Sequence, residues 1–291
     1  MERRLFIFSF PAASLFCCED TCRKDLASTL YKSVVRILAY HMVEPRFDLA
    51  ITRVTPRQFA AQIEGLLSAD YALLSLREGL SSSRLQDKSV ILTFDDAYAS
   101  VFKHAFPVLR ANGLRATLYV PAGYIGRLDD WDVNFGNIQF PHMTADQILT
   151  LHAAGWEIGS HGFSHLDLTR LAGERLEEEV AGSRAVLEKL IGGRVDAISY
   201  PFGNTDERVI TCCLRAGYRS GVVMSRPHKT LEGNMALTRL GVYLYDFQTL
   251  FEKKVFGKYE KMFKFIQRGI DFCSDGTVLV RQGFKKPRKS A

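Results

Sequence analysis

The sequence has few of the features that mark specialised classes of protein. Its 291 residues include only six cysteines, and it contains no apolar stretch of transmembrane length, no Gly-rich dinucleotide fingerprint, no internal repeat and no low-complexity linker. The cysteines are clustered or isolated, at Cys17, Cys18, Cys22, Cys212, Cys213 and Cys273. This spacing excludes a small disulfide scaffold or a zinc finger and favours reduced, mostly buried thiols.

The overall composition is that of an ordinary soluble globular protein. Hydrophobic residues make up 47% of the chain, charged residues 24% and aromatic residues 11%. These fractions exclude a disordered or collagen-like chain and provide enough apolar side chains for a sizeable core. The net charge of +6 is uneven, because residues 251–291 hold 11 Lys and Arg against 4 Asp and Glu, a net charge of +7. The other 250 residues therefore have a net charge of −1.

The two ends of the chain allow alternative interpretations. Residues 1–33 contain Glu2-Arg3-Arg4 and a short apolar run, which fits either a signal peptide or an N-terminal segment packed on the domain. A signal peptide would direct the protein to the cell envelope or the exterior; otherwise we expect a cytoplasmic or peripheral membrane protein. Residues 246–291 alternate lysines with apolar residues, which predicts either a helix on an anionic membrane surface or a helix that covers the domain. We expect no nucleic-acid binding, since no such motif is present.

The alternation of strand and helix patterns predicts an α/β fold with parallel pairing. Strands are predicted over residues 34–40, 89–94, 115–120, 156–160, 195–200, 218–223 and 237–243. Helix starts are predicted at Thr55-Pro56 and at Thr144, a long helix over residues 169–190, and a further one over residues 205–216. About seven or eight such units without a dinucleotide fingerprint favour a (β/α) barrel over a doubly wound sheet. We assign this barrel to residues 34–245 as one domain.

Polar residues recur at one place in this pattern, the C-terminal end of the predicted strands. They are His41, Asp95, Asp96, His161, His165 and the run Tyr200-Pro201-Phe202. In an α/β barrel the C-terminal ends of the strands form the face that holds the active site. The recurrence therefore predicts that these residues meet at one site.

Two groups among these residues suggest a metal ion. Asp95 and Asp96 are adjacent carboxylates after a buried strand, so they need a cation or a proton; alternatively, Asp96 caps the next helix while Asp95 faces solvent. His161 and His165 are four residues apart, so one helical turn would place both imidazoles on one face, a spacing that suits zinc. Two His and one Asp leave open positions for water and substrate, as in a catalytic metal site.

The same ligand set also occurs in non-haem iron oxygenases. Those enzymes are usually built on antiparallel double-sheet folds, which this strand–helix alternation does not resemble. A second carboxylate beside the metal-binding one favours hydrolysis, because it can act as a general base on water.

Three segments together resemble the motifs of the polysaccharide deacetylase (NodB-homology) family of carbohydrate esterases. They are Thr93-Phe94-Asp95-Asp96, Ser160-His161-Gly162-Phe163-Ser164-His165 and Tyr200-Pro201-Phe202-Gly203. The resemblance covers roughly residues 34–243 and implies a distorted (β/α) barrel and metal-dependent removal of acetyl groups from glycans. It implies that Asp95 is the general base and that Asp96, His161 and His165 are the metal ligands. The backbone N–H of Phe202, after Tyr200 and Pro201, would donate to the oxyanion of the tetrahedral intermediate.

The chain departs from the family pattern at two positions. The family's third motif usually begins with an Arg that orients the catalytic Asp, and Ser199 stands there. The family also usually has a catalytic His in a late Leu-x-x-His motif, which the strand at residues 237–243 lacks. The segment that ends at His41 is similar to the N-terminal strand of the circularly permuted subgroup of poly-β-1,6-N-acetylglucosamine deacetylases. This similarity implies that His41 is the general acid, and Arg239 is a candidate for the missing Arg function.

The leading hypothesis is therefore a metal-dependent hydrolase that removes acetyl groups from N-acetylhexosamine units of a polysaccharide or glycolipid. Zinc is the expected divalent metal, while cobalt, nickel and iron accept the same ligands. Two alternatives stay open. Ser199 suggests an inactive glycan-binding module on the same fold, and a related hydrolase would cleave the C–N bond of a non-sugar amide.

Overall fold

Parallel strands of the described chain close into a ring. The computed structural model describes residues 36–45, 52–81, 88–129, 139–224 and 233–256. Around the ring the order is β1 (Arg36–Tyr40), β10 (Leu237–Gly241), β9 (Ser220–Met224), β8 (Ala197–Ser199), β7 (Glu157–Ser160), β6 (Thr117–Val120) and β5 (Ser89–Phe94). The pairing of β1 with β5 closes it, with Tyr40 opposite Phe94. The strands thus form a closed seven-stranded parallel barrel, which confirms the predicted α/β barrel.

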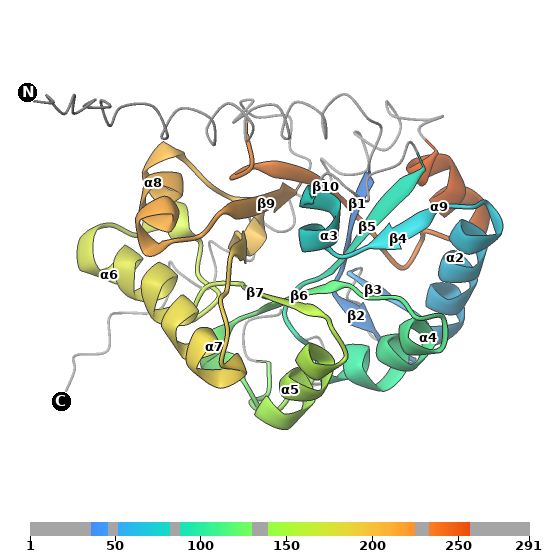
Figure 1. Cartoon of the computed structure of the whole chain (residues 1–291), viewed down its shortest axis with the longest axis horizontal. Coiled ribbons are helices and arrows are strands. Elements are labelled where there is room, and N and C mark those ends of the chain that lie inside the picture. Colours follow the sequence, from blue (N-terminus) through green and yellow to red (C-terminus); the bar gives the residue numbers. More distant parts are fainter. Residues whose placement is uncertain (1–35, 46–51, 82–87, 130–138, 225–232, 257–291) are drawn as a thin grey trace, which may run out of the picture.

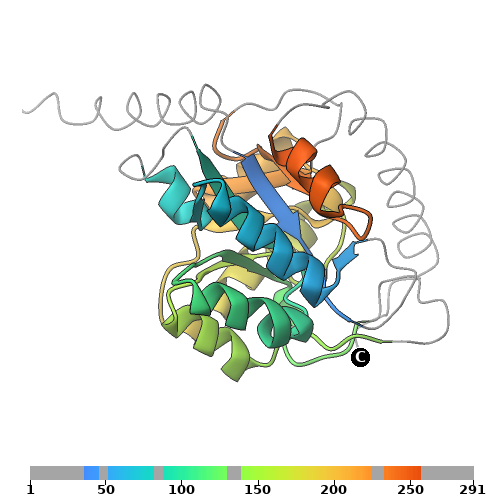
Figure 2. The ribbon, with the colours of Figure 1, turned by 90° about the vertical axis from the view of Figure 1, so that its right-hand side faces the viewer.

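Helices form a layer outside the strands (Figure 1). The α-helices are α2 (Pro56–Ser68), α3 (Leu76–Leu80), α4 (Phe106–Ala111), α5 (Ala145–Ala153), α6 (Gly173–Glu177), α7 (Ser183–Ile191), α8 (Glu207–Ala216) and α9 (Gln248–Val255). Shorter 3₁₀ or π-helical turns are η1 (Val101–Ala105), η2 (Ala122–Tyr124), η3 (Leu168–Arg170), η4 (Glu178–Gly182) and η5 (Pro201–Gly203). Figure 2, turned by 90°, shows α9 (orange-red) beside β1 (blue). The guanidinium of Arg36 in β1 donates to the carbonyl of Val255 in α9 at 3.3 Å. Three further short strands are β4 (Ala72–Leu74), which pairs with β5, and β2 (Met42–Val43) with β3 (Arg53–Val54).

The two faces of each strand contribute to two different cores, as the two-residue period of a strand requires. In β5, Val90, Leu92 and Phe94 belong to the large apolar cluster that packs under the helices. Ile91 faces the other way, into a smaller cluster that includes Ile37 and other residues of the ring strands. Every second residue counted from Ile91 therefore points into the barrel. This alternation brings Thr93 and Asp95 into the barrel interior.

The helix predictions hold at the starts of two helices and misplace the start of a third. Thr55 and Thr144 are the N-caps of α2 and α5, as predicted. The long helix predicted over residues 169–190 is present but starts four residues later, since α6, η4 and α7 run without a break from Gly173 to Ile191. The chain forms the turn η3, then an extended Leu171 and Ala172, and the helix begins only at Gly173.

Some predictions fall on residues outside the described ranges. These are the signal-like segment at residues 1–33 and the basic segment from residue 257 onward. The assignment of residues 34–245 as one domain stays a prediction. Across the described ranges, no helix combines the length and the hydropathy that a membrane span requires.

Candidate active site

The closing strands of the ring bring His41 and Asp95 together. His41 follows β1 and Asp95 follows β5, and the backbone N–H of Asp95 donates to the carbonyl of Tyr40 at 2.9 Å. The two strands are in register, so these residues are neighbours at the C-terminal edge of the barrel. The Nδ1 atom of His41 is buried and has no hydrogen-bond partner among the described residues.

Three side chains converge beside this pair. The Oδ1 atom of Asp96 lies 3.4 Å from Nε2 of His161 and 3.3 Å from Nε2 of His165. All three residues are buried, and one potential ligand atom from each lies within 4.8 Å of the other two. This cluster of one carboxylate and two imidazoles has the donor atoms and the spacing to hold a divalent metal ion.

The backbone that holds these ligands differs from the helical turn expected for His161 and His165. No helix spans residues 161–165, and Gly162 (φ +74°) and His165 (φ +51°) adopt left-handed conformations. The loop brings the imidazoles together, with ring centroids 4.8 Å apart. Nor does Asp96 cap a helix, since Asp96 and Ala97 are also left-handed, at φ +65° and +51°. Such backbone strain in residues other than glycine is concentrated at functional sites.

The electrostatics of the cluster suit a cation. Burial would raise the pKa of the Asp96 carboxyl, but His165 and His161 outweigh it and hold that pKa far below its ordinary value. Burial would likewise lower the pKa of His161, yet the nearby Asp95 and Asp96 carboxylates raise it. The buried Oδ1 of Asp96 has no hydrogen-bond partner within the described part of the chain. A metal ion would supply the positive charge that this oxygen otherwise lacks.

Asp95 is held by a guanidinium group from β10, the strand that flanks β1 on the side away from β5. Arg239, fully buried on β10, donates from both terminal nitrogens to the two carboxylate oxygens of Asp95, at 2.7 and 2.6 Å. The same guanidinium donates to the hydroxyl of Thr93 at 3.0 Å and to that of Ser199 at 2.8 Å. This bidentate arrangement is the strongest common form of charge-assisted hydrogen bond.

Ser199, at the position where the family usually has an Arg, also contributes to this network. Its hydroxyl donates to Oδ2 of Asp95 at 3.2 Å, and its carbonyl lies 2.7 Å from Nδ1 of His161. Burial alone would raise the pKa of Asp95, but Arg239 and His161 lower it overall. Asp95 therefore stays ionised inside the barrel, with its orientation fixed.

The run Tyr200-Pro201-Phe202 forms a tight turn at the end of β8. Phe202 has a left-handed backbone (φ 60°, ψ 6°), and its ring lies against the imidazole of His165, with centroids 4.8 Å apart. The side chain of Tyr200 points elsewhere, because its hydroxyl donates to the carbonyl of Met235 in the outer core at 2.9 Å. Within this turn the side chain of Phe202, and not that of Tyr200, lies at the metal ligands.

One neighbour of the site was not singled out by the sequence. His104, His142, His152 and His228 match no motif, so the sequence predicts surface or structural roles for them. His142 has such a structural role directly beside the site. It is buried, its Nδ1 lies 2.6 Å from the carbonyl of Asp96, and its ring stacks on Tyr98. A lone His in a segment without periodicity gives no sequence signal of such a contact. His228 lies outside the described residues.

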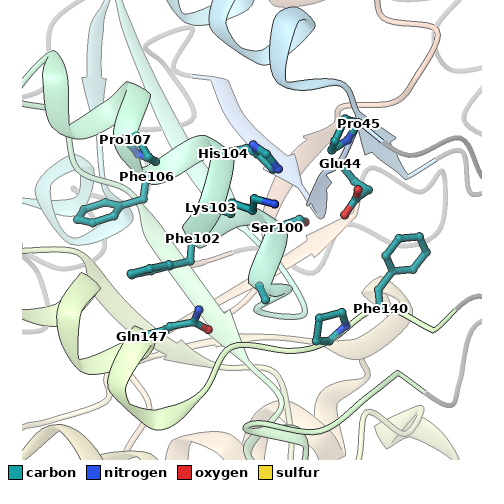
Figure 3. A pocket seen from close by; sticks show the side chains of 12 residues that line it. Glu44, Pro45, Ser100, Phe102, Lys103, His104, Phe106, Pro107, Phe140 and Gln147 are labelled. Carbon is teal, nitrogen blue, oxygen red and sulfur yellow. The ribbon is translucent and has the colours of Figure 1, made fainter.

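A pocket of about 690 Å³ is lined by residues 44–45, by residues of η1 and α4 and by Phe140, Pro141 and Gln147, and by none of the candidate site residues. Figure 3 shows aromatic and polar side chains around it, among them Phe102, Lys103, His104 and Glu44. Ala99, three residues after Asp96, donates its backbone N–H to the carbonyl of Pro141 at 2.8 Å, and both residues line the pocket.

Comparison with known protein families identifies the family to which this chain belongs. The family model for polysaccharide deacetylases matches residues 82–221, a range that contains Asp95, Asp96, His161, His165 and Phe202. The chain belongs to the polysaccharide deacetylase family. The segment with His41 precedes the matched range and Arg239 follows it, and the closure of the ring brings both to the site.

Two curated relatives are named for the same kind of activity. YxkH of Bacillus subtilis (strain 168), whose name places it among polysaccharide deacetylases, is 28% identical over 190 residues, 64% of this chain and 63% of the relative. The poly-β-1,6-N-acetyl-D-glucosamine N-deacetylase of Staphylococcus aureus (strain MRSA252) is 23% identical over 193 residues, 62% of this chain and 64% of the relative. The chain thus aligns with less than two thirds of the length of either relative.

Solved structures share the fold. The deacetylase PplD of Streptococcus pyogenes, solved in complex with acetate, superposes with a TM-score of 0.65 and 23% identity, covering 76% of this chain and 97% of that one. At this identity the likeness establishes the distorted NodB-type barrel and nothing finer.

Proposed function

We propose that this protein is a metal-dependent hydrolase that removes acetyl groups from N-acetylhexosamine units of a polysaccharide or glycolipid. The observation that supports this most is the placement of Asp95, bound by Arg239, directly beside the cluster of Asp96, His161 and His165. A base next to a metal site is the arrangement that hydrolysis of an amide needs.

In this proposal Asp96, His161 and His165 hold the metal, with zinc as the first expectation and cobalt, nickel or iron as others that accept these donors. When bound, a divalent metal lowers the pKa of water and polarises the acetyl carbonyl. The carbonyl of Ser199 accepts from Nδ1 of His161, which leaves Nε2 free to donate its lone pair toward the ligand cluster.

Asp95 is the proposed general base. It accepts a proton from the attacking water as the water oxygen bonds to the acetyl carbon. Its bidentate pair with Arg239 serves two purposes, since it orients the carboxylate and keeps it ionised inside the barrel. Arg239 acts as a positioning residue here, in place of the Arg that the family usually has at position 199.

His41 is the proposed general acid. The C–N bond breaks as the nitrogen takes a proton from the imidazole, and the products are acetate and a free amine. The backbone N–H of Phe202 is proposed to donate to the oxyanion, and Tyr200 and Pro201 shape the turn that presents it. The contact of the Phe202 ring with His165 supports this placement of the turn beside the metal ligands.

The pocket lined by Ala99, three residues after Asp96, has the aromatic and polar lining that suits a further sugar unit. Aromatic side chains such as Phe102 pack against the apolar faces of sugar rings, and polar side chains such as Lys103 and Gln147 bond hydroxyls. We propose that this pocket receives a neighbouring unit of the glycan.

Acetate release from acetylated β-1,6-linked and β-1,4-linked glucosamine oligomers tests the proposal. The parent protein loaded with zinc should release acetate, and removal of the metal with a chelator should abolish the release until zinc is restored. Bound zinc without turnover on any acetylated glycan would support the glycan-binding module instead, the alternative that Ser199 suggested. Turnover confined to non-sugar amides would support the third hypothesis.

The roles within the site are tested by two substitutions. Asp95→Asn and His41→Ala should each lower kcat by about 10²–10⁴-fold, the usual contribution of a general base or acid, while zinc stays bound. Zinc content measured on the same samples separates loss of catalysis from loss of metal. Acetate release by His41→Ala at the parent rate would show that another group protonates the amine.

A further inference from the structure

A second buried carboxylate lies behind the loop that contains His161 and His165. Only 6% of the Glu179 surface is exposed. Its Oε2 accepts the backbone N–H of Phe163 at 2.9 Å and that of Ser164 at 2.8 Å. These two residues lie between the two metal ligands in the sequence, so one oxygen atom binds the centre of the loop. Hydrogen bonds to a carboxylate are roughly twice as strong as neutral ones.

The turn that presents Glu179 is π-helical. It is η4, inserted between α6 and α7 (Figure 1), and such insertions occur frequently at functional sites. The carbonyl of Val180 in this turn accepts the hydroxyls of Ser183 at 2.9 Å and Tyr218 at 3.1 Å. These bonds tie the turn to α7 and to the segment before β9, so Glu179 is presented from a fixed support.

Gly162, the second residue of the 161–165 loop, is linked to the same turn through Ser160 and Ser183. The backbone N–H of Gly162 donates to the hydroxyl of Ser160 at 3.1 Å, and that hydroxyl lies 2.8 Å from the hydroxyl of Ser183. Three consecutive N–H groups of the loop, at residues 162, 163 and 164, therefore all bind side chains that are supported by η4.

The carbonyl side of the loop is held from the opposite direction. Ala122 donates its N–H to the carbonyl of Gly162 at 3.0 Å, and Gly123 donates to that of Phe163 at 2.8 Å. A Cβ atom on Gly123 would lie 2.7 Å from the Phe163 oxygen, closer than real Cβ contacts allow. The loop is thus clamped between η2 and η4.

From these contacts we infer that Glu179 is a positioning residue of the metal centre. It holds the 161–165 loop in the left-handed conformations of Gly162 and His165 that direct both imidazoles at Asp96. Without the carboxylate, two N–H groups lose their acceptor and the loop relaxes, so the histidines no longer match the metal. This inference rests on the metal centre of the proposed function.

The test is the zinc affinity of Glu179→Ala, measured on folded protein by competition with a chromophoric chelator. We expect zinc to bind about 10–100-fold more weakly, the usual effect of losing an outer partner of a metal ligand. Glu179→Gln keeps an oxygen that can accept both N–H groups, and it should bind zinc close to the parent value. Glu178→Ala, an exposed glutamate of the same turn, is the matched control and should leave the affinity unchanged.

The outcomes separate the two proposals. If the parent protein itself does not bind zinc, the metal centre of the proposed function is wrong. If the parent binds zinc and a folded Glu179→Ala binds it equally well, the metal centre stands and the role of Glu179 is overturned.

A measurement on the parent protein keeps the inference testable if Glu179→Ala does not fold. The amides of Phe163 and Ser164 should exchange with solvent far more slowly than expected for a loop, both with zinc and after its removal, because the Glu179 bonds do not depend on the metal. Exchange of these two amides at the rate of an open loop would overturn the inference.

Discussion

At the scale of the single residue, Arg239 is the side chain with the most demanding environment. It is fully buried and its charge is balanced by Asp95 through two short hydrogen bonds. The small side chain of Ser199 accepts a third hydrogen bond from the same guanidinium, so serine at this position belongs to the network around Asp95. The group that orients Asp95 therefore lies on β10. This strand is two strands away from β8, which contains Ser199.

Removing this guanidinium should leave an unpaired carboxylate in the barrel. We expect Arg239→Met to lower the free energy of unfolding by about 3–5 kcal/mol, the usual cost of breaking a buried pair by removing one partner. The measurement is urea denaturation followed by circular dichroism. Adding Asp95→Asn to this variant should restore part of the loss, since a neutral amide leaves no buried charge.

The matched control for this variant is Arg219→Met. Arg219 is half exposed and lies 3.7 Å from a carboxylate oxygen of Asp196, and surface pairs of this kind contribute about 0–1 kcal/mol. An Arg239→Met protein as stable as the Arg219→Met protein would contradict the pairing described for Asp95.

At the scale of the element, the start of α2 is bonded to the segment that follows β10. Thr55 and Gln58 form a capping box, in which the Thr55 hydroxyl accepts the N–H of Gln58 at 3.2 Å and the Gln58 side chain accepts the N–H of Thr55 at 3.0 Å. The amide of Gln58 also donates to the carbonyl of Leu244 at 2.9 Å, beyond β10. The cap thus fixes both the helix and the segment that leads to α9.

Loss of this cap should weaken the protein measurably. Thr55→Ala is expected to lower the free energy of unfolding by about 0.5–2 kcal/mol, since the N–H of Gln58 loses its acceptor. Thr211→Ala is the control, because Thr211 is exposed within α8 and alanine is the better helix former. Urea denaturation of both variants checks the prediction, and an equal stability of the two would count against the cap.

The elements also show what local sequence can and cannot predict. Thr55 and Thr144 predict the starts of their helices because the side chain of an N-cap residue accepts a backbone N–H of the first helical turn. The extended residues Leu171 and Ala172 before α6 left no such signal, since an acidic, amphipathic pattern continues across them. The sequence did not predict β4 and α3, because segments of three and five residues are too short to show the period of a strand or a helix.

The metal ligands illustrate the same limit. Residue type and family resemblance made His161 and His165 candidate metal ligands, but the spacing suggested a helical turn where a strained loop exists. The loop conformation depends on contacts from Glu179 and Gly123, which are distant in the sequence. Nothing in the run Glu177-Glu178-Glu179 distinguishes the one buried glutamate from its exposed neighbours.

At the scale of the whole molecule, the site exists only because the ring is closed. β1 precedes the range that the family model matches, yet it pairs with β5 on one edge and with β10 on the other. Leu38, Ala39 and Tyr40 are completely buried. The Tyr40 hydroxyl donates to the Gln62 side chain, whose amide in turn donates to the carbonyl of Asp246, so β1 is linked to both α2 and the segment before α9.

This closure predicts that the strand before His41 opens only when the whole protein unfolds. In native-state hydrogen exchange, the amides of Leu38 and Tyr40 should have the same opening free energy as those of Val90 and Leu92 in β5, because a strand bonded on both edges cannot leave without breaking the ring. Opening free energies near the global value, about 5–15 kcal/mol for domains in general, are expected for all four. If β1 exchanged through a lower-energy opening, it would be an appended strand, and His41 would be presented to Asp95 only part of the time.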